Sequence, residues 1–243
     1  MVQRVYFADL THTGVGVNSR AFPLGVGCVM AHANKELKGQ IRSSLFKFPE
    51  DLNKALLEQT PSMLCMSNFC WNINLSYTFI KYVKNINPNI ITVFGGPNFP
   101  IDEGERASFL RDHPCLDFYI KWDGEIAFVN LFKKLAEVDF DLTQFKKNKT
   151  ISENCCYVHE NQYIEGPDHR ADDLAALPSP YLDGLFDQFF GLNLQPWIET
   201  TRGCPYACTF CNDGHGSRNG IKRKVKHQIQ EEIEYIATRA DNS

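Results

Sequence analysis

The chain has 243 residues, enough for one large domain or two small ones whose core needs no disulfide support. Hydrophobic residues make up 43% and charged residues 22%, as in ordinary soluble globular proteins, and the net charge of −4 argues against nucleic acid or an anionic membrane as a partner. The N-terminus is polar where a signal peptide is apolar, no run approaches the roughly 18 apolar residues of a spanning helix, and the nine cysteines are an odd number. We therefore expect a cytoplasmic protein with reduced thiols.

Residues 1–138 alternate short apolar runs with longer helical patterns. The apolar runs predict strands over 4–10, 41–46, 62–67, 90–94 and 116–121. The helical patterns lie over 23–37, 49–59, 71–85, 104–112 and 124–138. This alternation predicts an α/β fold with a flavodoxin- or Rossmann-like, doubly wound parallel sheet.

The third predicted helix carries the clearest apolar stripe. Its members recur every four residues and are expected to lie against the sheet: Trp71, Leu75, Phe79 and Val83. Asn68 or Asn72 is the expected N-cap of this helix.

Polar and small residues follow several predicted strands at their carboxyl ends, where parallel sheets place ligands. They are Asp9, His12 and Gly14 after the first strand, Ser67 after the third, and Gly95 and Gly96 after the fourth. Paired glycines allow a flat ligand or a phosphate to approach the backbone, although any one of these features is also typical of a tight turn.

Residues 139–194 lack a sustained period and are expected to form a linker that docks the two ends of the protein together. Within it, residues 155–159 and 162–165 predict a small hairpin around Glu160-Asn161. A polar, proline-containing segment follows over 166–180, and then an aromatic run over 181–190.

Residues 195–243 predict a strand over 195–200, a cysteine-containing loop, and a helix that begins near Ile221. The apolar face of this helix is expected at Val225, Ile229, Ile233 and Ile236. A strand, a loop and a helix in this order would be the first β/α unit of a barrel of the TIM type.

The loop contains Cys204, Cys208 and Cys211 within eight residues, in the run Glu199-Thr-Thr-Arg-Gly-Cys-Pro-Tyr-Ala-Cys-Thr-Phe-Cys. Three thiolates this close together suit an iron–sulfur cluster that has one iron without a protein ligand. The alternative is a closed zinc site in which His215 is the fourth ligand.

The cysteine run resembles the radical S-adenosylmethionine (SAM) superfamily. The resemblance implies a [4Fe-4S] cluster on Cys204, Cys208 and Cys211, an open iron that chelates SAM, and Phe210 beside the adenine. It also implies an electron donor such as flavodoxin or ferredoxin. Reduction of the cluster would cleave SAM to methionine and a 5′-deoxyadenosyl radical.

The N-terminal region is similar to the cobalamin (B12)-binding domain that precedes many radical SAM barrels. The matching stretches are Phe22-Pro-Leu-Gly-Val-Gly, Val93-Phe-Gly-Gly-Pro-Asn and Asp117-Phe-Tyr-Ile-Lys-Trp-Asp-Gly-Glu. The resemblance implies cobalamin contacts at Asp9, His12, Gly14, Ser67, Gly95 and Gly96. The histidine departs from the family's Asp-x-His-x-x-Gly pattern by one position, and Trp122 and Asp123 stand where Gly and Glu are common.

The sequence therefore predicts a domain of the cobalamin-binding type over 1–138, a linker over 139–194 and the start of a radical SAM barrel over 195–243. The superfamily suggests methyl transfer to, or rearrangement of, a small-molecule metabolite. Because only one barrel unit precedes Ser243, we expect this chain alone to be inactive, as a fragment or as one chain of a barrel that a partner completes. The alternative is a non-catalytic cofactor-binding or scaffold module.

Overall fold

The computed structural model describes residues 2–14, 19–206, 208–209, 211 and 220–240. Strands and helices alternate through its first half as β1 (Gln3–Ala8), α1 (Leu24–Glu36), β2 (Ile41–Phe46), α2 (Pro49–Glu58), β3 (Met63–Ser67), α3 (Ile73–Ile86), β4 (Ile91–Gly95), α4 (Glu103–Asp112), β5 (Phe118–Ile120) and α5 (Gly124–Ala136). The second half contains α6 (Leu142–Lys147), β6 (Cys155–His159), β7 (Gln162–Glu165), the 3-10 turns η1 (Leu174–Ala176) and η2 (Asp187–Phe189), β8 (Thr201–Arg202), β9 (Lys222–Arg223) and α7 (Lys226–Ala237).

A seven-stranded sheet in the order β2-β1-β3-β4-β5-β6-β7 forms the centre of the molecule. Strands β1 to β5 pair in parallel, and β6 and β7 add an antiparallel edge. The α/β class with a mostly parallel sheet is therefore confirmed. The strand order reverses direction between β1 and β3, and such a switch point is where open α/β sheets bind ligands.

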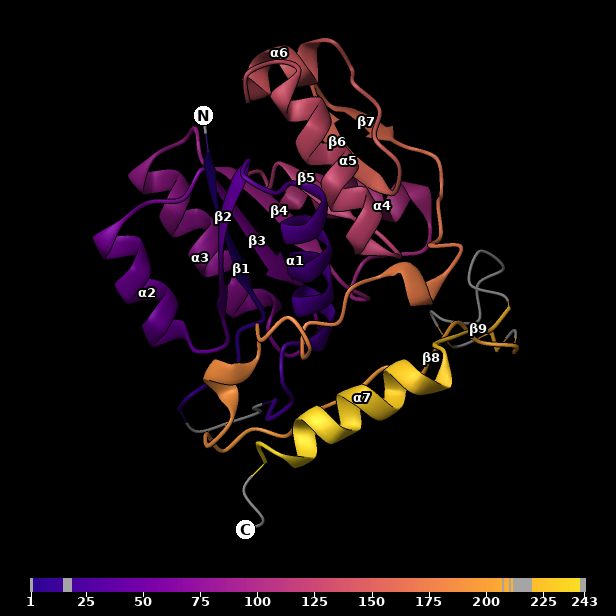
Figure 1. Cartoon of the computed structure of the whole chain (residues 1–243). Helices are drawn as coiled ribbons and strands as arrows, with labels where there is room; N and C mark the ends of the chain where they lie inside the picture. The colour runs from indigo at the N-terminus through magenta and orange to yellow at the C-terminus, as the bar shows by residue number, and fades with distance from the viewer. Residues whose placement is uncertain (1, 15–18, 207, 210, 212–219, 241–243) are drawn as a thin grey trace.

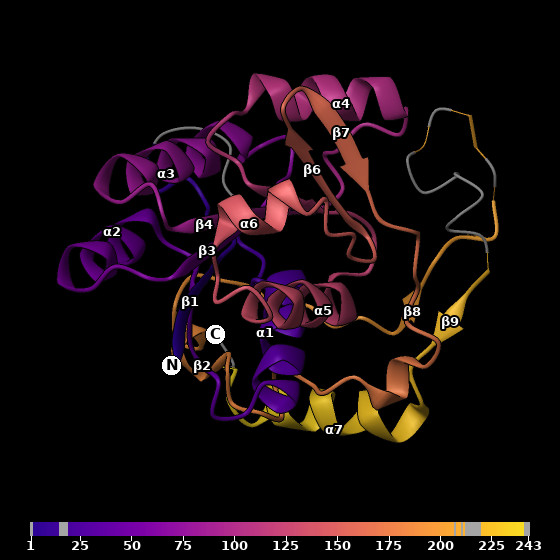
Figure 2. The ribbon, with the colours of Figure 1, turned by 90° about the horizontal axis from the view of Figure 1, so that it is seen from above.

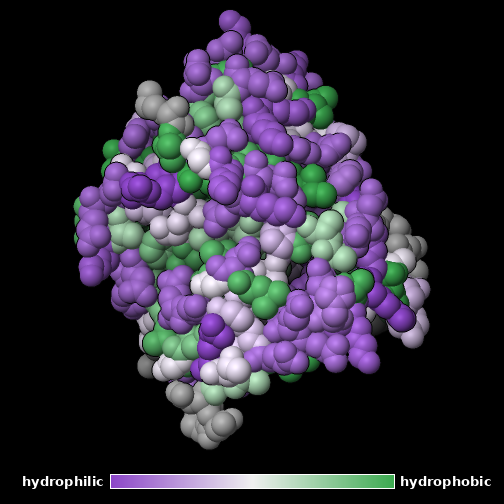
Figure 3. Space-filling model, in the orientation of Figure 1, coloured by the Kyte–Doolittle hydropathy of each residue, from purple (hydrophilic) through white to green (hydrophobic). Residues whose placement is uncertain are grey.

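Helices cover both faces of the sheet, with α1, α5 and α6 on one face and α2, α3 and α4 on the other (Figure 2). Alternate strand residues supply the two cores: Val5 and Phe7 face the α1/α5 side, whereas Tyr6 and Ala8 face the α2/α3 side. In Figure 1 helix α7 crosses below the sheet, on the side to which β1 runs from the N-terminus, at the carboxyl ends of the parallel strands. Figure 3 shows that the outside of this view is mostly hydrophilic, with several small hydrophobic patches.

The stripe expected on α3 is displaced around the helix. The buried positions are Ser76, Ile80 and Val83, while Leu75 and Phe79 are half-buried. A strict spacing of four drifts around a helix that has 3.6 residues per turn, so the sheet-facing row changes along its length. Trp71 is exposed and precedes the helix, and Asn72 occupies the N-cap without a capping hydrogen bond from its side chain.

The hairpin expected at 155–159 and 162–165 is present as β6 and β7, but it does not stand apart in a linker. It extends the main sheet, because Ile120 and Tyr119 of β5 pair with Cys155 and Cys156. The short helix α6, in the same part of the chain, was not expected; Phe145 anchors it in the core.

The strand expected over 195–200 is not formed. Gln195 makes only an isolated bridge to Ala21, and the carbonyl of Thr200 accepts one bond from the amide of Lys224. A strand needs a continuous neighbour, and this extended segment has only single contacts. The strand of this region is instead β8, which directly follows the expected range and pairs antiparallel with β9.

Helix α7 starts at Lys226 because β9 occupies residues near its expected beginning. Its inward row contains Ile229, Glu232 and Ile236, whereas Val225 and Ile233 of the expected face are exposed. Glu232 is buried because Lys224 pairs with it at 2.7 Å. Within the part of the chain that the structure describes, no helix combines the length and the apolarity that a membrane crossing requires.

Candidate functional site

A cavity of about 670 Å³ opens at the carboxyl ends of the parallel strands. Its walls come from the ends of β1, β3 and β4, from the first turns of α1 and α5, and from residues 195–202, which we call the approach segment because they lead to Cys204. The lining is largely apolar and aromatic, as expected of a site for a large organic ligand. The cavity therefore lies between the sheet domain and the chain that enters the cysteine loop.

Two adjacent glycines at the end of β4 form part of the cavity wall. Gly96 has a φ of +123°, and a Cβ there would lie 2.7 Å from the backbone oxygen of Asn68. Only glycine fits this backbone without displacement. The hydroxyl of Tyr119 donates to the carbonyl of Gly96 at 2.8 Å and accepts from the amide of Asn68 at 3.1 Å, which fixes the turn.

Asp9 and Ser67 line the same cavity, but their polar groups are already engaged. The carboxylate of Asp9 accepts from the Lys47 ammonium at 2.9 Å, from the Ser67 hydroxyl at 2.5 Å and from the Asn72 amide at 3.3 Å. The Lys47 side chain is 0% exposed. Asn72 therefore binds this network instead of capping α3, and the network shapes the cavity floor.

His12 and Gly14 are absent from the described cavity lining. The Nε2 atom of His12 lies 3.0 Å from the carbonyl oxygen of Trp71, which is a lining residue, so His12 lies next to the wall without forming part of it. Of the six residues expected to contact a cofactor, the structure brings together Asp9, Ser67, Gly95 and Gly96, and it does not bring the other two into the wall.

Several aromatic side chains line the cavity. Phe69 and Trp71 stack with ring centroids 4.5 Å apart and an interplanar angle of 7°, and Trp197 of the approach segment is exposed. Trp122 also lines the cavity and has a φ of +60°, in the left-handed region. This conformation favours glycine and costs another residue about 1–2 kcal/mol, which explains why glycine is common at this position in the pattern.

The stretch from Asp117 to Glu125 is divided between two ends of the sheet. Asp117 precedes β5 and pairs with Lys84 at 2.5 Å, away from the cavity. Asp123 and Glu125 follow β5 and line the cavity at the N-terminus of α5, where the helix dipole stabilises negative charge.

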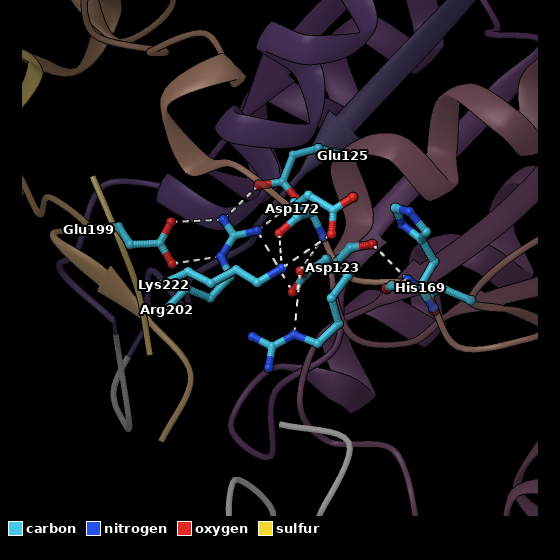
Figure 4. A network of polar contacts seen from close by, with 10 residues as sticks. Asp123, Glu125, His169, Asp172, Glu199, Arg202 and Lys222 are labelled. Carbon is cyan, nitrogen blue, oxygen red and sulfur yellow. Dashed lines mark hydrogen bonds and ion pairs between the residues drawn. The ribbon is translucent and has the colours of Figure 1, made fainter. Parts of the chain in front are cut away.

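Arg202 connects these carboxylates to the approach segment (Figure 4). Its guanidinium donates to Glu125 at 2.7 and 3.1 Å and to Glu199 at 2.7 and 2.9 Å. Asp123 lies 3.7 Å away and also pairs with Arg170 at 3.7 Å. Arg202 and Glu125 belong to two stretches that the sequence analysis singled out. Their contact could not be predicted, because these stretches are far apart in the chain.

The three cysteines of the loop are free thiols. Cys208 is exposed, and Cys204 and Cys211 are half-buried. No three His, Cys, Asp or Glu side chains among the described residues are gathered as metal ligands. Phe210, the expected adenine contact, and His215, the fourth ligand of the zinc alternative, lie outside the described residues.

Four other cysteines are core residues. Burial raises the pKa of the Cys28, Cys65 and Cys155 thiols, and it raises that of Cys156 to about 12. Their thiols therefore stay protonated at neutral pH and pack as small apolar side chains.

No family model matches the chain. The chain is 29% identical over 252 residues to the cobalamin-dependent radical SAM methyltransferase TokK of Streptomyces tokunonensis, covering 97% of this chain and 34% of TokK. It is 28% identical over 253 residues to the 2-(S-pantetheinyl)-carbapenam-3-carboxylate methyltransferase of Streptantibioticus cattleyicolor, with the same coverage of 97% and 34%.

The fold is similar to that of OxsB, a cobalamin-dependent SAM radical enzyme solved with aqua-cobalamin and SAM bound. The TM-score is 0.68 at 18% identity, and the match covers 98% of this chain and 32% of OxsB. The structure of OxsB with aqua-cobalamin alone gives a TM-score of 0.67 at 17% identity, with the same coverage of 98% and 32%. Homologues of this chain are thus cobalamin-dependent radical SAM methyltransferases, which confirms the resemblance seen in the sequence. The chain spans about a third of the length of these relatives.

Proposed function

We propose that this chain forms the corrinoid-binding region and the cluster-binding loop of a cobalamin-dependent radical SAM protein. The observation that carries the proposal is the cavity of about 670 Å³, one wall of which is the segment that leads directly into the cysteine triplet. A corrinoid site and a cluster site would then be adjacent within one chain. Two homologues that span the whole chain support the same assignment.

The cavity fits a large, flat, mostly apolar ligand. Gly95 and Gly96 let such a ligand approach the backbone, and the stacked pair of Phe69 and Trp71 offers an aromatic surface at the mouth. We propose that Asp9 and Ser67 act from the cavity floor, and that His12 and Gly14 act only if their loop moves toward the ligand. This chain's part is to bind the corrinoid and to shield it from water.

The cysteine loop fits a cluster by the chemistry of its donors. Cys208 is exposed and Cys204 and Cys211 are half-buried, whereas the four core cysteines are buried. Metal sites commonly form only when the metal binds, so separate thiols in the ligand-free loop agree with the proposal. Phe210 is proposed to contact the adenine of SAM.

When bound, the cluster supplies an electron for the cleavage of SAM, and the corrinoid supplies methyl-transfer or rearrangement chemistry. We propose a small-molecule substrate, an electron donor such as flavodoxin or ferredoxin, and a barrel completed beyond these residues. We also propose the division into residues 1–138, 139–194 and 195–243, with the 155–165 hairpin joined to the N-terminal sheet.

Filling the cavity tests the corrinoid site. Gly25, in the first turn of α1, lines the cavity, and a Cβ there meets nothing within 4 Å. We expect Gly25→Phe to fold normally and to lose the hydroxocobalamin that the wild-type chain retains after desalting, measured by its visible absorbance. Glu36→Phe, at the exposed far end of the same helix, is the matched control and keeps the corrinoid. If the wild-type chain retains no corrinoid, the cavity assignment is wrong.

Replacing the loop cysteines tests the cluster. After anaerobic reconstitution with iron and sulfide, we expect the wild-type chain to hold a [4Fe-4S] cluster and the triple variant Cys204→Ala/Cys208→Ala/Cys211→Ala to hold none. Cys70→Ala, which removes an exposed thiol outside the loop, is the control and keeps the cluster. Stoichiometric zinc without sulfide would support the alternative site instead.

A further inference from the structure

Arg202 occupies a position that belongs at once to the cavity and to the cysteine loop. Its guanidinium lines the cavity, and its backbone lies in β8, two residues before Cys204. The side chain is only 14% exposed, although it carries a full charge. A buried cation of this kind is costly to hold unless several carboxylates compensate it.

The compensating groups come from two different parts of the fold. Glu125, at 4% exposure, belongs to the first turn of α5, and Glu199 belongs to the approach segment itself. Each carboxylate accepts two hydrogen bonds from the planar guanidinium, so distance and orientation are both fixed. Figure 4 shows the guanidinium between the two carboxylates.

The contacts at the start of the approach segment lie farther from the loop. Gln195 makes one bridge to Ala21, and the carbonyl of Trp197 accepts from the Tyr181 hydroxyl at 2.7 Å. Neither involves a charged group. Among the described residues, Arg202 therefore makes the ion pairs nearest to Cys204 that join the loop to the cavity wall, at 2.7 Å to Glu125 and 3.7 Å to Asp123.

We infer that Arg202 is a positioning residue: through Glu125 it holds the cysteine loop at a fixed place against the cavity. A ligand that enters the cavity would then change the surroundings of a cluster bound to the loop. Only the effect of the occupied cavity on the cluster rests on the proposed function. The attachment of the loop does not, because Arg202 and Glu125 are paired without any cofactor.

The first experiment needs no cofactor. In the apo chain, alkylation of Cys204 by iodoacetamide, followed by peptide mass spectrometry, reports how often the loop leaves the cavity wall. We expect Arg202→Gln and Glu125→Gln each to speed this alkylation severalfold, with Arg202→Lys in between, while alkylation of Cys70 is unchanged. Arg106→Gln is the matched control, because Arg106 is a similarly buried arginine with two bonds to Glu165 at the far sheet edge. Equal Cys204 rates in Arg202→Gln and Arg106→Gln would overturn the inference.

The second experiment tests the coupling. In the reconstituted wild-type chain and in Arg106→Gln, addition of hydroxocobalamin should shift the EPR spectrum of the reduced cluster. Arg202→Gln should lose this shift while it still binds both groups. An unchanged shift in Arg202→Gln contradicts the coupling. If the wild-type chain binds neither group, the proposed function fails instead, and the alkylation result still decides the attachment.

Discussion

At the scale of single residues, the cavity depends on charges that are buried in pairs. Asp9 was singled out in the sequence as a ligand contact, but its carboxylate is saturated by Lys47, Ser67 and Asn72. The sequence showed an aspartate at the end of a strand, and it could not show that three partners from other elements converge on it. The position of Asp9 at the cavity was thus predictable from the sequence, and its three partners were not.

Removal of this carboxylate should destabilise the fold. In Asp9→Asn the buried ammonium of Lys47 loses the one ion-pair partner that it has among the described residues, and we expect the free energy of unfolding to fall by about 3 kcal/mol in urea titrations. The double variant Asp9→Asn/Lys47→Met leaves no buried charge and should recover part of that loss. A single variant within about 0.5 kcal/mol of wild type would show that the pair is not important for stability.

Eight of the nine cysteines should separate into two reactive classes. At pH 8 we expect brief iodoacetamide treatment to modify Cys70, Cys204, Cys208 and Cys211, and to spare the four core cysteines, whose pKa burial raises. Loading with iron and sulfide should protect the three loop cysteines and leave Cys70 reactive, and removal of the metal should restore the first pattern. Peptide mass spectrometry measures this; a loop that reacts equally with and without metal is not the ligand set.

At the scale of elements, local periodicity predicted most of the sheet and its helices, while contacts between distant segments were not predictable. The runs at 155–159 and 162–165 gave the hairpin with its observed bounds, but its attachment to β5 depends on a pairing that no local pattern records. The expected strand at 195–200 had the right composition and lacked a neighbour. Glu232 of helix α7 faces inward because Lys224 pairs with it.

Besides its pairing with β5, the hairpin is joined to its neighbours by the carboxylate of Glu165. Glu165 of β7 accepts from Arg106 of α4 at 2.7 and 2.9 Å and from Lys121 and Tyr163. Burial acts to raise the pKa of Glu165, but the bonds from Lys121, Tyr163 and Arg106 outweigh it and lower the pKa. The charged form is therefore favoured in the folded state.

Glu165→Gln should cost about 2 kcal/mol of unfolding free energy at pH 7. Because the folded pKa is lowered, this contribution is present above the unfolded value of roughly 4.3 and is lost as the pH falls through the folded value. The difference from wild type should therefore shrink below about pH 4. Glu160→Gln, in the exposed turn of the same hairpin, should stay close to wild type at both pH values. A difference for Glu165→Gln that is independent of pH would contradict the ion-pair explanation.

At the scale of the whole molecule, the central feature is the meeting of two parts of the chain that are far apart in sequence. The cysteine spacing and the order of strands and helices predicted both parts and their family resemblance. The strand order, the cavity and the tie between Arg202 and Glu125 arise only when the sheet domain and the approach segment come together. Such contacts depend on three-dimensional proximity. A single sequence can therefore single out Arg202 and Glu125, but it cannot show that they form an ion pair.

The central claim is that this one chain binds both a corrinoid and an iron–sulfur cluster, and content analysis of one preparation tests it most directly. The wild-type chain would be reconstituted without oxygen with iron, sulfide and hydroxocobalamin, desalted, and analysed for all three and for zinc. We predict about four iron, about four sulfide and about one corrinoid per chain. A colourless protein with bound zinc, no sulfide and no corrinoid would contradict the account.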